Sequence, residues 1–211
     1  MSSKPPRRAP RQQRSRAMVE RILDAGLAVL VEHGYERAGT GRVAAQAGVS
    51  PGSLYQYFAD KHELLARVIE RETERLRTRI SRAFVRHLGE PTPERIVRAN
   101  VVTLLDTFEA NAGLLRVVYE QLPPSADAHR TDFKHRVDEL VATALQLQTR
   151  GGERVEAIAW VLVRTVENVA INYVLDPPPL GRAAVVDELT ALITAYLAER
   201  LDPGATASTS D

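Results

Sequence analysis

Side chains that can hydrogen-bond the edges of DNA bases gather between residues 50 and 58. Gln56 carries an amide that can bond adenine through two atoms, and Ser53 can bond a base or a phosphate. Tyr55 can stack on a thymine methyl or reach a phosphate through its hydroxyl, or its ring can pack against the helix predicted over residues 15–33. Polar side chains on one helix face, with phosphate ligands at its edges, are what reading a major groove requires.

Two short helices are predicted to position these side chains, over residues 40–47 and 51–57. Gly48 ends the first helix, because glycine readily adopts the left-handed conformation of a helix end. Ser50 caps the second helix, and Pro51 occupies its first position, where a missing N–H costs nothing. A helix, a glycine turn and a second polar helix are typical of helix-turn-helix proteins, which insert the second helix into the major groove.

The run GYERAGTGRVAAQAGVSPGSLYQYFADKHELL resembles the signature of TetR-like transcriptional regulators. The resemblance implies a DNA-binding domain over residues 15–75, with its helix-turn-helix motif at 38–57. It also implies that Thr40, Tyr57 and Lys61 grip the DNA backbone. The DNA-contact residues that we predict are Thr40, Arg42, Ser50, Gly52, Ser53, Tyr55, Gln56, Tyr57 and Lys61.

The motif departs from the family pattern at two positions. Gly41 stands where the family often has a polar base reader, and Pro51 stands where lysine or glutamine is common. Both changes remove direct readout of bases. Specificity is therefore expected to depend on Arg42, Gln56 and the shape of the DNA.

Positive charge is concentrated in the same part of the chain. Residues 1–62 hold ten Lys/Arg and five Asp/Glu, a net charge of +5, so the remainder carries −4 of the total of +1. Residues 1–14 are rich in proline and lack acids, and we expect a disordered basic arm. The arm is either a solvated tail or an extension that contacts DNA phosphates. Its cationic residues, together with Arg16 just after it, are Lys4, Arg7, Arg8, Arg11 and Arg14.

The rest of the chain is predicted to be helical, and no segment alternates as a strand does. A first helix over 15–33 is expected to end at Gly34, and Asp60 with Glu63 forms a capping box for a helix reaching residue 87. Gly89 to Pro93 marks a break. Further helices are expected at 93–110, 112–121, 125–149, 152–175 and 182–201. The predicted fold is all-α with about nine helices, followed by a disordered tail over 202–211.

The resemblance implies a second domain over residues 76–201 that binds an effector and forms a homodimer. In the family, the last two long helices, here 152–175 and 182–201, pack across a two-fold axis, so two chains bind a palindromic operator. The apolar stripe of the last helix fits this expectation, although burial within one chain would also explain it. Its residues are Val185, Leu189, Leu192, Ile193 and Tyr196.

The effector is expected to be a small molecule in a cavity of the second domain. Four residues of the helix over 152–175 follow each other at steps of four and are predicted to share one face: Trp160, Arg164, Asn168 and Asn172. This face lines a pocket, fixes the register of the dimer or pairs with Glu167 and other acids. The apolar candidates are also explained as ordinary core. The full set is Leu104, Leu105, Phe108, Leu115, Val118, Tyr119, Trp160, Arg164, Asn168 and Asn172. Few acids fall on these faces, which favours an apolar or anionic effector.

Several other classes of protein are disfavoured. The chain has no cysteine, no HExxH metal motif and no GxSxG nucleophile elbow, so we expect neither an enzyme nor a bound metal or cofactor. Gly39, Gly41 and Ala44 fit a dinucleotide fingerprint, but no strand precedes them. The apolar stretch 157–175 contains Arg164 and Glu167, which would be costly in lipid, so no membrane span is expected.

These observations together predict a cytoplasmic DNA-binding regulator of transcription. The absence of cysteine suits a reducing compartment. Repression relieved by a small molecule is the commonest mode in the family. The alternative is a helical DNA-binding or interaction protein without ligand control, and a solid core in the second domain would favour it.

Overall fold

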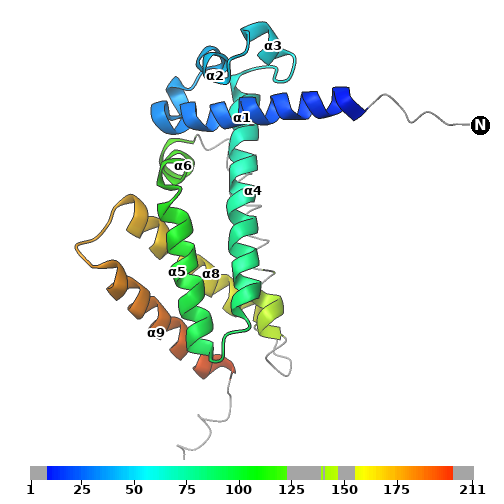
Figure 1. Ribbon diagram of the computed structural model, residues 1–211. Coiled ribbons are helices and arrows are strands. Elements are labelled where there is room, and N and C mark those ends of the chain that lie inside the picture. The colour runs from blue at the N-terminus through cyan, green and yellow to red at the C-terminus, as the bar shows by residue number, and fades with distance from the viewer. Residues whose placement is uncertain (1–8, 123–138, 140, 147–154, 202–211) are drawn as a thin grey trace, which may run out of the picture. The chain divides into compact units, whose positions relative to one another are not determined.

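The computed structural model describes residues 9–122, 139, 141–146 and 155–201. All regular secondary structure in these ranges is helical, which confirms the all-α prediction (Figure 1). The helices are α1 (Ala9–Arg37), α2 (Thr40–Ala47), α3 (Pro51–Tyr55), α4 (Lys61–His87), α5 (Pro93–Glu109), α6 (Ala112–Arg116), the π-helix η1 (Val117–Gln121), α8 (Val155–Leu175) and α9 (Arg182–Leu201).

The chain divides into two compact units. Unit 1 comprises Met1–Glu72 and Arg116–Asp127, and unit 2 comprises Thr73–Leu115 and Ala128–Asp211. The division falls inside α4, so this one helix belongs to both units. The inclusion of η1 in unit 1 was not foreseen, because the sequence suggested a single domain over 76–201.

Local signals place most helix ends correctly. Gly48 adopts φ 63° and ψ 40° after α2, and the Ser50 hydroxyl accepts a hydrogen bond from the Ser53 N–H at 3.1 Å. At the start of α4, Asp60 Oδ1 accepts from the Glu63 N–H at 2.9 Å, as the capping box predicts. The Glu63 carboxylate reaches back to the Ala59 N–H at 2.7 Å, one residue before the usual partner.

Three helices differ from the prediction, and one of them is α3, which ends at Tyr55 and not at residue 57. Residues 9–14 begin α1 and are not disordered, because Arg and Gln favour helix and Pro10 lies in the first turn, where proline is tolerated. The helix predicted over 112–121 changes to π geometry at Val117. Of the helix predicted over 125–149, residues 139 and 141–146 are helical and the others lie outside the described residues. Residues 1–8 and 202–211 also lie outside the described residues.

The core of unit 1 forms where α1, α2, α3 and the first turns of α4 meet. Ile22, Leu30, Val43, Leu54 and Leu65 are fully buried there. Gly26 allows α1 and α4 to approach closely, since a Cβ atom at this position would lie 2.7 Å from Cγ2 of Val68. The absence of a side chain at one position therefore determines the spacing of the two helices that support α2 and α3.

An arginine on α4 adds an electrostatic tie to α1. The Arg71 side chain is only 12% exposed and contacts carboxylates of Glu20 at 3.0 Å, Asp24 at 2.8 Å and Glu72 at 2.7 Å. A buried guanidinium needs such partners, because an unpaired charge away from water is expensive. This cluster restrains the same pair of helices as Gly26.

The end of α1 is held by side chains from three other elements of unit 1. Gly34 breaks the helix at φ 75° and ψ 168°, a conformation essentially restricted to glycine. The Tyr35 N–H donates to Oε1 of Gln121 at 3.0 Å, Nζ of Lys61 donates to the Glu36 carbonyl at 2.7 Å, and Arg42 donates to the Arg37 carbonyl at 3.1 Å. These bonds fix the chain immediately before α2.

Unit 2 is organised around α5, which packs against both α8 and α9 (Figure 1). Val101, Leu105 and Ala159 lie in its core. At the surface, Arg98 of α5 pairs with Asp187 of α9 at 2.6 Å, and Arg182 pairs with Asp106 and Glu109.

Helix α8 is long and apolar enough, by length and composition alone, to cross a membrane. Its buried residues are the face of a helix packed in a core, and it carries a buried ion pair between Arg164 and Glu167 at 3.1 Å. We therefore interpret α8 as a core helix of unit 2.

We predict that Gly26→Val lowers the free energy of unfolding by about 1–3 kcal/mol, because the new side chain collides with Val68. Thermal or urea unfolding measures the loss. The double variant with Val68→Ala should lose less than the sum of the two single losses. Gly41→Ala is the control, because no atom lies within 4 Å of a Cβ there. Equal effects of Gly26→Val and Gly41→Ala would contradict this packing.

The Tyr35 phenol gives a second test. Burial, followed by the charges of Glu36 and Asp60, raises the pKa of Tyr35 above its usual 10.0. The folded chain therefore holds this proton more tightly than the unfolded chain does. The stabilisation that the Tyr35 phenol contributes to the folded state is complete below pH 10 and is lost as the pH rises through the raised pKa of Tyr35.

We expect the free energy of unfolding to fall more steeply above pH 10 in the parent than in Tyr35→Phe. The difference can reach about 1.4 kcal/mol per pH unit. Indistinguishable slopes for the parent and Tyr35→Phe would show that Tyr35 does not titrate differently on folding.

Candidate nucleic-acid interface and ligand cavity

The turn after α3 presents side chains with unused hydrogen-bonding capacity. Gln56 is exposed and Tyr57 is half-buried, and neither side chain makes a hydrogen bond with any described residue. Tyr55 is 53% exposed, so its ring is not packed against α1. The inward face is supplied by Leu54 and Phe58, which are both buried. The packing thus directs the polar side chains of this segment outward.

Two pairs of hydroxyl groups lie on α2 and α3 and the turn between them. The Thr40 hydroxyl at the start of α2 lies 3.2 Å from the Tyr55 hydroxyl, which links α2 to α3. Ser50 and Ser53 also pair, at 2.9 Å between their hydroxyl oxygens. Gly52 is exposed between them, and no side chain there blocks an approaching phosphate.

The two predicted cations sit beside the end of α1. Arg42 is exposed and Lys61 is half-buried, and each donates one hydrogen bond to a backbone carbonyl of α1. The Lys61 ammonium also lies 5.4 Å from the centre of the Tyr35 ring. Each cation keeps further N–H donors. These contacts therefore orient both charges and leave donors available to an anion.

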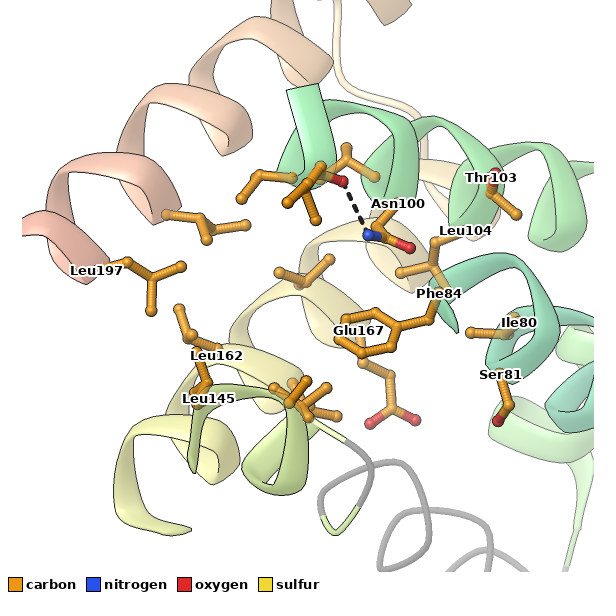
Figure 2. A pocket seen from close by; sticks show the side chains of 18 of the residues that line it. Ile80, Ser81, Phe84, Asn100, Thr103, Leu104, Leu145, Leu162, Glu167 and Leu197 are labelled. Carbon is orange, nitrogen blue, oxygen red and sulfur yellow. Dashed lines mark hydrogen bonds between the residues drawn. The ribbon is translucent and has the colours of Figure 1, made fainter. Parts of the chain in front are cut away.

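Unit 2 contains an apolar cavity of about 190 Å³. Figure 2 shows Phe84 of α4, Leu104 of α5, Leu162 of α8 and Leu197 of α9 directed around this space. The wall is almost entirely apolar, so the space is suited to a hydrophobic molecule.

A few polar groups interrupt this wall. Arg164 and Glu167 lie on it as the buried ion pair of α8, and the Asn100 amide donates to the Ile96 carbonyl at 2.8 Å (Figure 2). Ser81 and Thr103 add hydroxyl groups. The cavity therefore combines a large apolar surface with one charged pair and three neutral polar side chains.

The predicted ligand residues are only partly brought together. Leu104, Phe108 and Arg164 line the cavity. Leu105 and Leu115 are buried in ordinary core, and Val118 and Tyr119 belong to η1 in unit 1, so these four do not form its wall.

The pocket interpretation fails for three of the four polar and aromatic residues of α8, because they do not line the cavity, and a role of these residues in the dimer register stays a prediction. Steps of four residues drift by about 40° in a helix of 3.6 residues per turn, so Trp160 and Asn172 point in different directions. Trp160 is 55% exposed. The Asn168 and Asn172 amides donate to carbonyls one turn earlier, both at 2.8 Å. Only Arg164 reaches the cavity, and it pairs with Glu167.

Sequence reasoning missed the contribution of α4 to this cavity. Ile80, Ser81 and Phe84 line it, and none of the three is among the predicted ligand residues. The spacing of four residues between Ile80 and Phe84 was the available signal. Among the described residues, no group of three or more His, Asp or Glu side chains could hold a metal ion.

Comparison with known families matches both units of the chain. A model described as bacterial regulatory proteins of the tetR family covers residues 22–68. A second model, described as the tetracyclin repressor-like C-terminal domain, covers residues 92–197, half of the chain.

Curated relatives agree with this assignment. The transcriptional repressor KstR of Mycolicibacterium smegmatis is 44% identical over 64 residues, 30% of this chain and 31% of that protein. The transcriptional activator FasR of the same organism is 33% identical over 114 residues, covering 54% and 48%. KstR of Mycobacterium tuberculosis is 29% identical over 156 residues, covering 74% and 69%. The chain thus spans a third to a half of the first two relatives.

Solved structures share the same fold. A transcriptional regulator from Rhodococcus has a TM-score of 0.68 at 25% identity, covering 86% of this chain and 96% of that one. The fatty acid degradation regulator FadR from Bacillus halodurans has a TM-score of 0.65 at 20% identity, covering 91% and 96%. Proteins of this family bind DNA operators, form dimers and respond to small-molecule effectors. With models of both its parts matched, the chain belongs to the tetR family of bacterial DNA-binding transcriptional regulators.

Proposed function

We propose that this protein is a dimeric repressor that binds a palindromic operator through α2 and α3 and releases it when an apolar small molecule occupies unit 2. The observation that carries the proposal is the pairing of an outward-facing polar segment at Tyr55–Tyr57 with an apolar cavity of about 190 Å³ in the same chain. Their combination is what an effector-controlled DNA-binding protein requires.

The DNA contacts divide by chemistry. Tyr55 at the end of α3 and Gln56 in the turn after it are assigned to base edges, because both side chains are exposed while Leu54 is buried. Thr40, Tyr57 and Lys61 are assigned to phosphates, together with the hydroxyls of Ser50 and Ser53. Arg42 and the backbone at Gly52 complete the set. Phosphate contacts set the register, and base contacts supply the specificity.

Dimerisation is supported by apolar side chains left exposed on α8 and α9. Trp160, Val161 and Val169 on α8 and Leu192 on α9 are each at least 37% exposed. Large exposed apolar residues on two consecutive long helices are typical of a protein interface. A two-fold dimer would place two copies of α3 on one face of duplex DNA, about 34–36 Å apart.

The cavity supports ligand control over the alternative of a DNA-binding protein without it. Its wall suits an effector with an apolar body and a single polar end near Arg164 and Glu167. One relative is named a fatty acid metabolism regulator and one solved neighbour a fatty acid degradation regulator. These names agree with an aliphatic effector. Release follows if the effector prefers the conformation that binds DNA poorly.

Repression is proposed as the mode, in agreement with the relatives named KstR, although FasR is named an activator. The relatives are regulators and not enzymes, so we assign no catalytic activity and no cofactor. We place the protein in the cytoplasm, where its DNA target lies.

Gln56→Ala should weaken operator binding roughly 5- to 150-fold, because each good bidentate base contact contributes about 1–3 kcal/mol of discrimination. Tyr57→Phe should also weaken binding, through the loss of one hydroxyl. Fluorescence anisotropy with a fragment of the promoter that the protein controls gives both affinities. The melting temperature should stay unchanged, since neither side chain has a hydrogen-bond partner among the described residues.

Gln146→Ala is the matched control, because Gln146 is an equally exposed glutamine in unit 2. It should bind the fragment like the parent. If Gln56→Ala and Tyr57→Phe also bind like the parent, the assignment of α3 as the reading helix is wrong.

Leu104→Trp should close the cavity, because the indole extends into a space of about 190 Å³. The neutral fluorophore N-phenyl-1-naphthylamine serves as the probe, and the variant should lose at least tenfold in affinity while operator binding persists. Leu180→Trp adds the same group at a position that is 58% exposed and should leave probe binding unchanged. Unaltered probe binding by Leu104→Trp would remove the cavity as the effector site.

A further inference from the structure

A row of arginines runs along α4 within unit 2. Residues 75–88 contain five arginines and one histidine but no acid, in a chain whose net charge is only +1. Four of these arginines are spaced by four, three and four residues, which places them on one face of the helix. They are Arg75, Arg79, Arg82 and Arg86, and all four are exposed.

The row borders a hollow of about 710 Å³. Thr78 of α4 and Thr103 of α5 contribute hydroxyl groups to its wall, and Glu74 and Asp106 also line it. We call this hollow the arginine groove. It is separate from the apolar cavity, whose residues Ile80, Ser81 and Phe84 lie on other faces of α4, although Thr103 lines both.

Two of the four arginines that line the arginine groove have no partner among the described residues. Arg79 and Arg82 make no hydrogen bond or ion pair with any described residue. The acids of the groove have other arginine partners, since Glu74 pairs with Arg77 and Asp106 pairs with Arg182. Like charges three and four residues apart destabilise a helix, so this arrangement has a cost that a bound anion would offset.

We propose that the arginine groove binds a small molecule bearing a pyrophosphate group. Guanidinium groups bind phosphate oxygens through two parallel hydrogen bonds, and successive pairs of arginines can each hold one phosphate. The row is about 16 Å long, from 11 residues at 1.5 Å each, which is long enough for two linked phosphates and a further group. A concave site of this volume fits a small ligand, whereas duplex DNA would need a protruding surface.

Isothermal titration calorimetry on the full chain tests this site, with sodium pyrophosphate, ADP and inorganic phosphate as probes at about 0.15 M ionic strength. Pyrophosphate should bind saturably, with one molecule per chain, and inorganic phosphate at least tenfold more weakly. Tighter binding of ADP than of pyrophosphate would identify a nucleotide-type ligand. Equal binding of the two would identify the phosphates alone as the recognised group.

The test variant is Arg79→Gln with Arg82→Gln, which removes the two arginines that have no described partner. It should weaken pyrophosphate binding at least tenfold. The control is Arg95→Gln with Arg200→Gln, which removes two charges from exposed positions of unit 2 outside the groove. The control should change the affinity less than twofold, and both variants should melt within about 2 °C of the parent.

Three results would overturn the proposal. The first is no saturable binding of pyrophosphate or ADP by the parent. The second is an equal loss in the groove variant and the control, which would show a general effect of charge. The third is equal affinity for phosphate and pyrophosphate. None of these results bears on operator binding, because the groove shares no predicted DNA-contact residue. They do not bear on the apolar cavity either, because Arg79 and Arg82 do not line it.

Discussion

Three consecutive backbone groups at the end of α1 connect the elements of unit 1. The Tyr35 N–H bonds Gln121 of η1, the Glu36 carbonyl bonds Lys61 of α4, and the Arg37 carbonyl bonds Arg42 of α2. The break at Gly34 frees these groups from the helical pattern. Each such bond contributes only about 1 kcal/mol. Their joint effect is geometric, because they fix where the chain leaves α1 and hence where α2 and α3 begin.

The same residues explain how unit 2 can influence unit 1. Within the described residues, the chain passes between the units twice, inside α4 and again at Leu115 and Arg116. On the unit 1 side of these crossings lie Arg71, which ties α4 to α1, and Gln121, which ties η1 to α1. A ligand that alters unit 2 therefore has two covalent routes to the end of α1. The ligand can weaken DNA binding only as far as its affinity differs between the conformation that binds DNA well and the conformation that binds DNA poorly.

Much of unit 1 could be predicted because its signals are local. Gly48, Ser50 and Pro51 each act on backbone groups within a few residues, so the ends of α2 and the start of α3 follow from the sequence alone. The buried positions Leu54 and Phe58 follow from helical spacing. The start of α1 was misjudged because a basic, proline-containing segment resembles a disordered tail, although its residues favour helix.

The cavity and the contacts of Gln121 depend on residues far apart in sequence, which a single sequence does not reveal. Spacing by four suggested one pocket-lining face for Trp160, Arg164, Asn168 and Asn172, but the two asparagine amides donate to the backbone and Trp160 is exposed. Only Arg164 lies on the wall. The arginine row was visible in the sequence, and the hollow beside it needed the placement of α5.

Hydroxyl-radical footprinting on a promoter fragment that the protein controls tests the central claim most directly, namely that two copies of the α2–α3 pair engage duplex DNA together. The account predicts two protected patches of equal strength on one face of the duplex, centred one helical turn or a whole number of turns apart. A single protected patch, or protection spread evenly along the fragment, would contradict it.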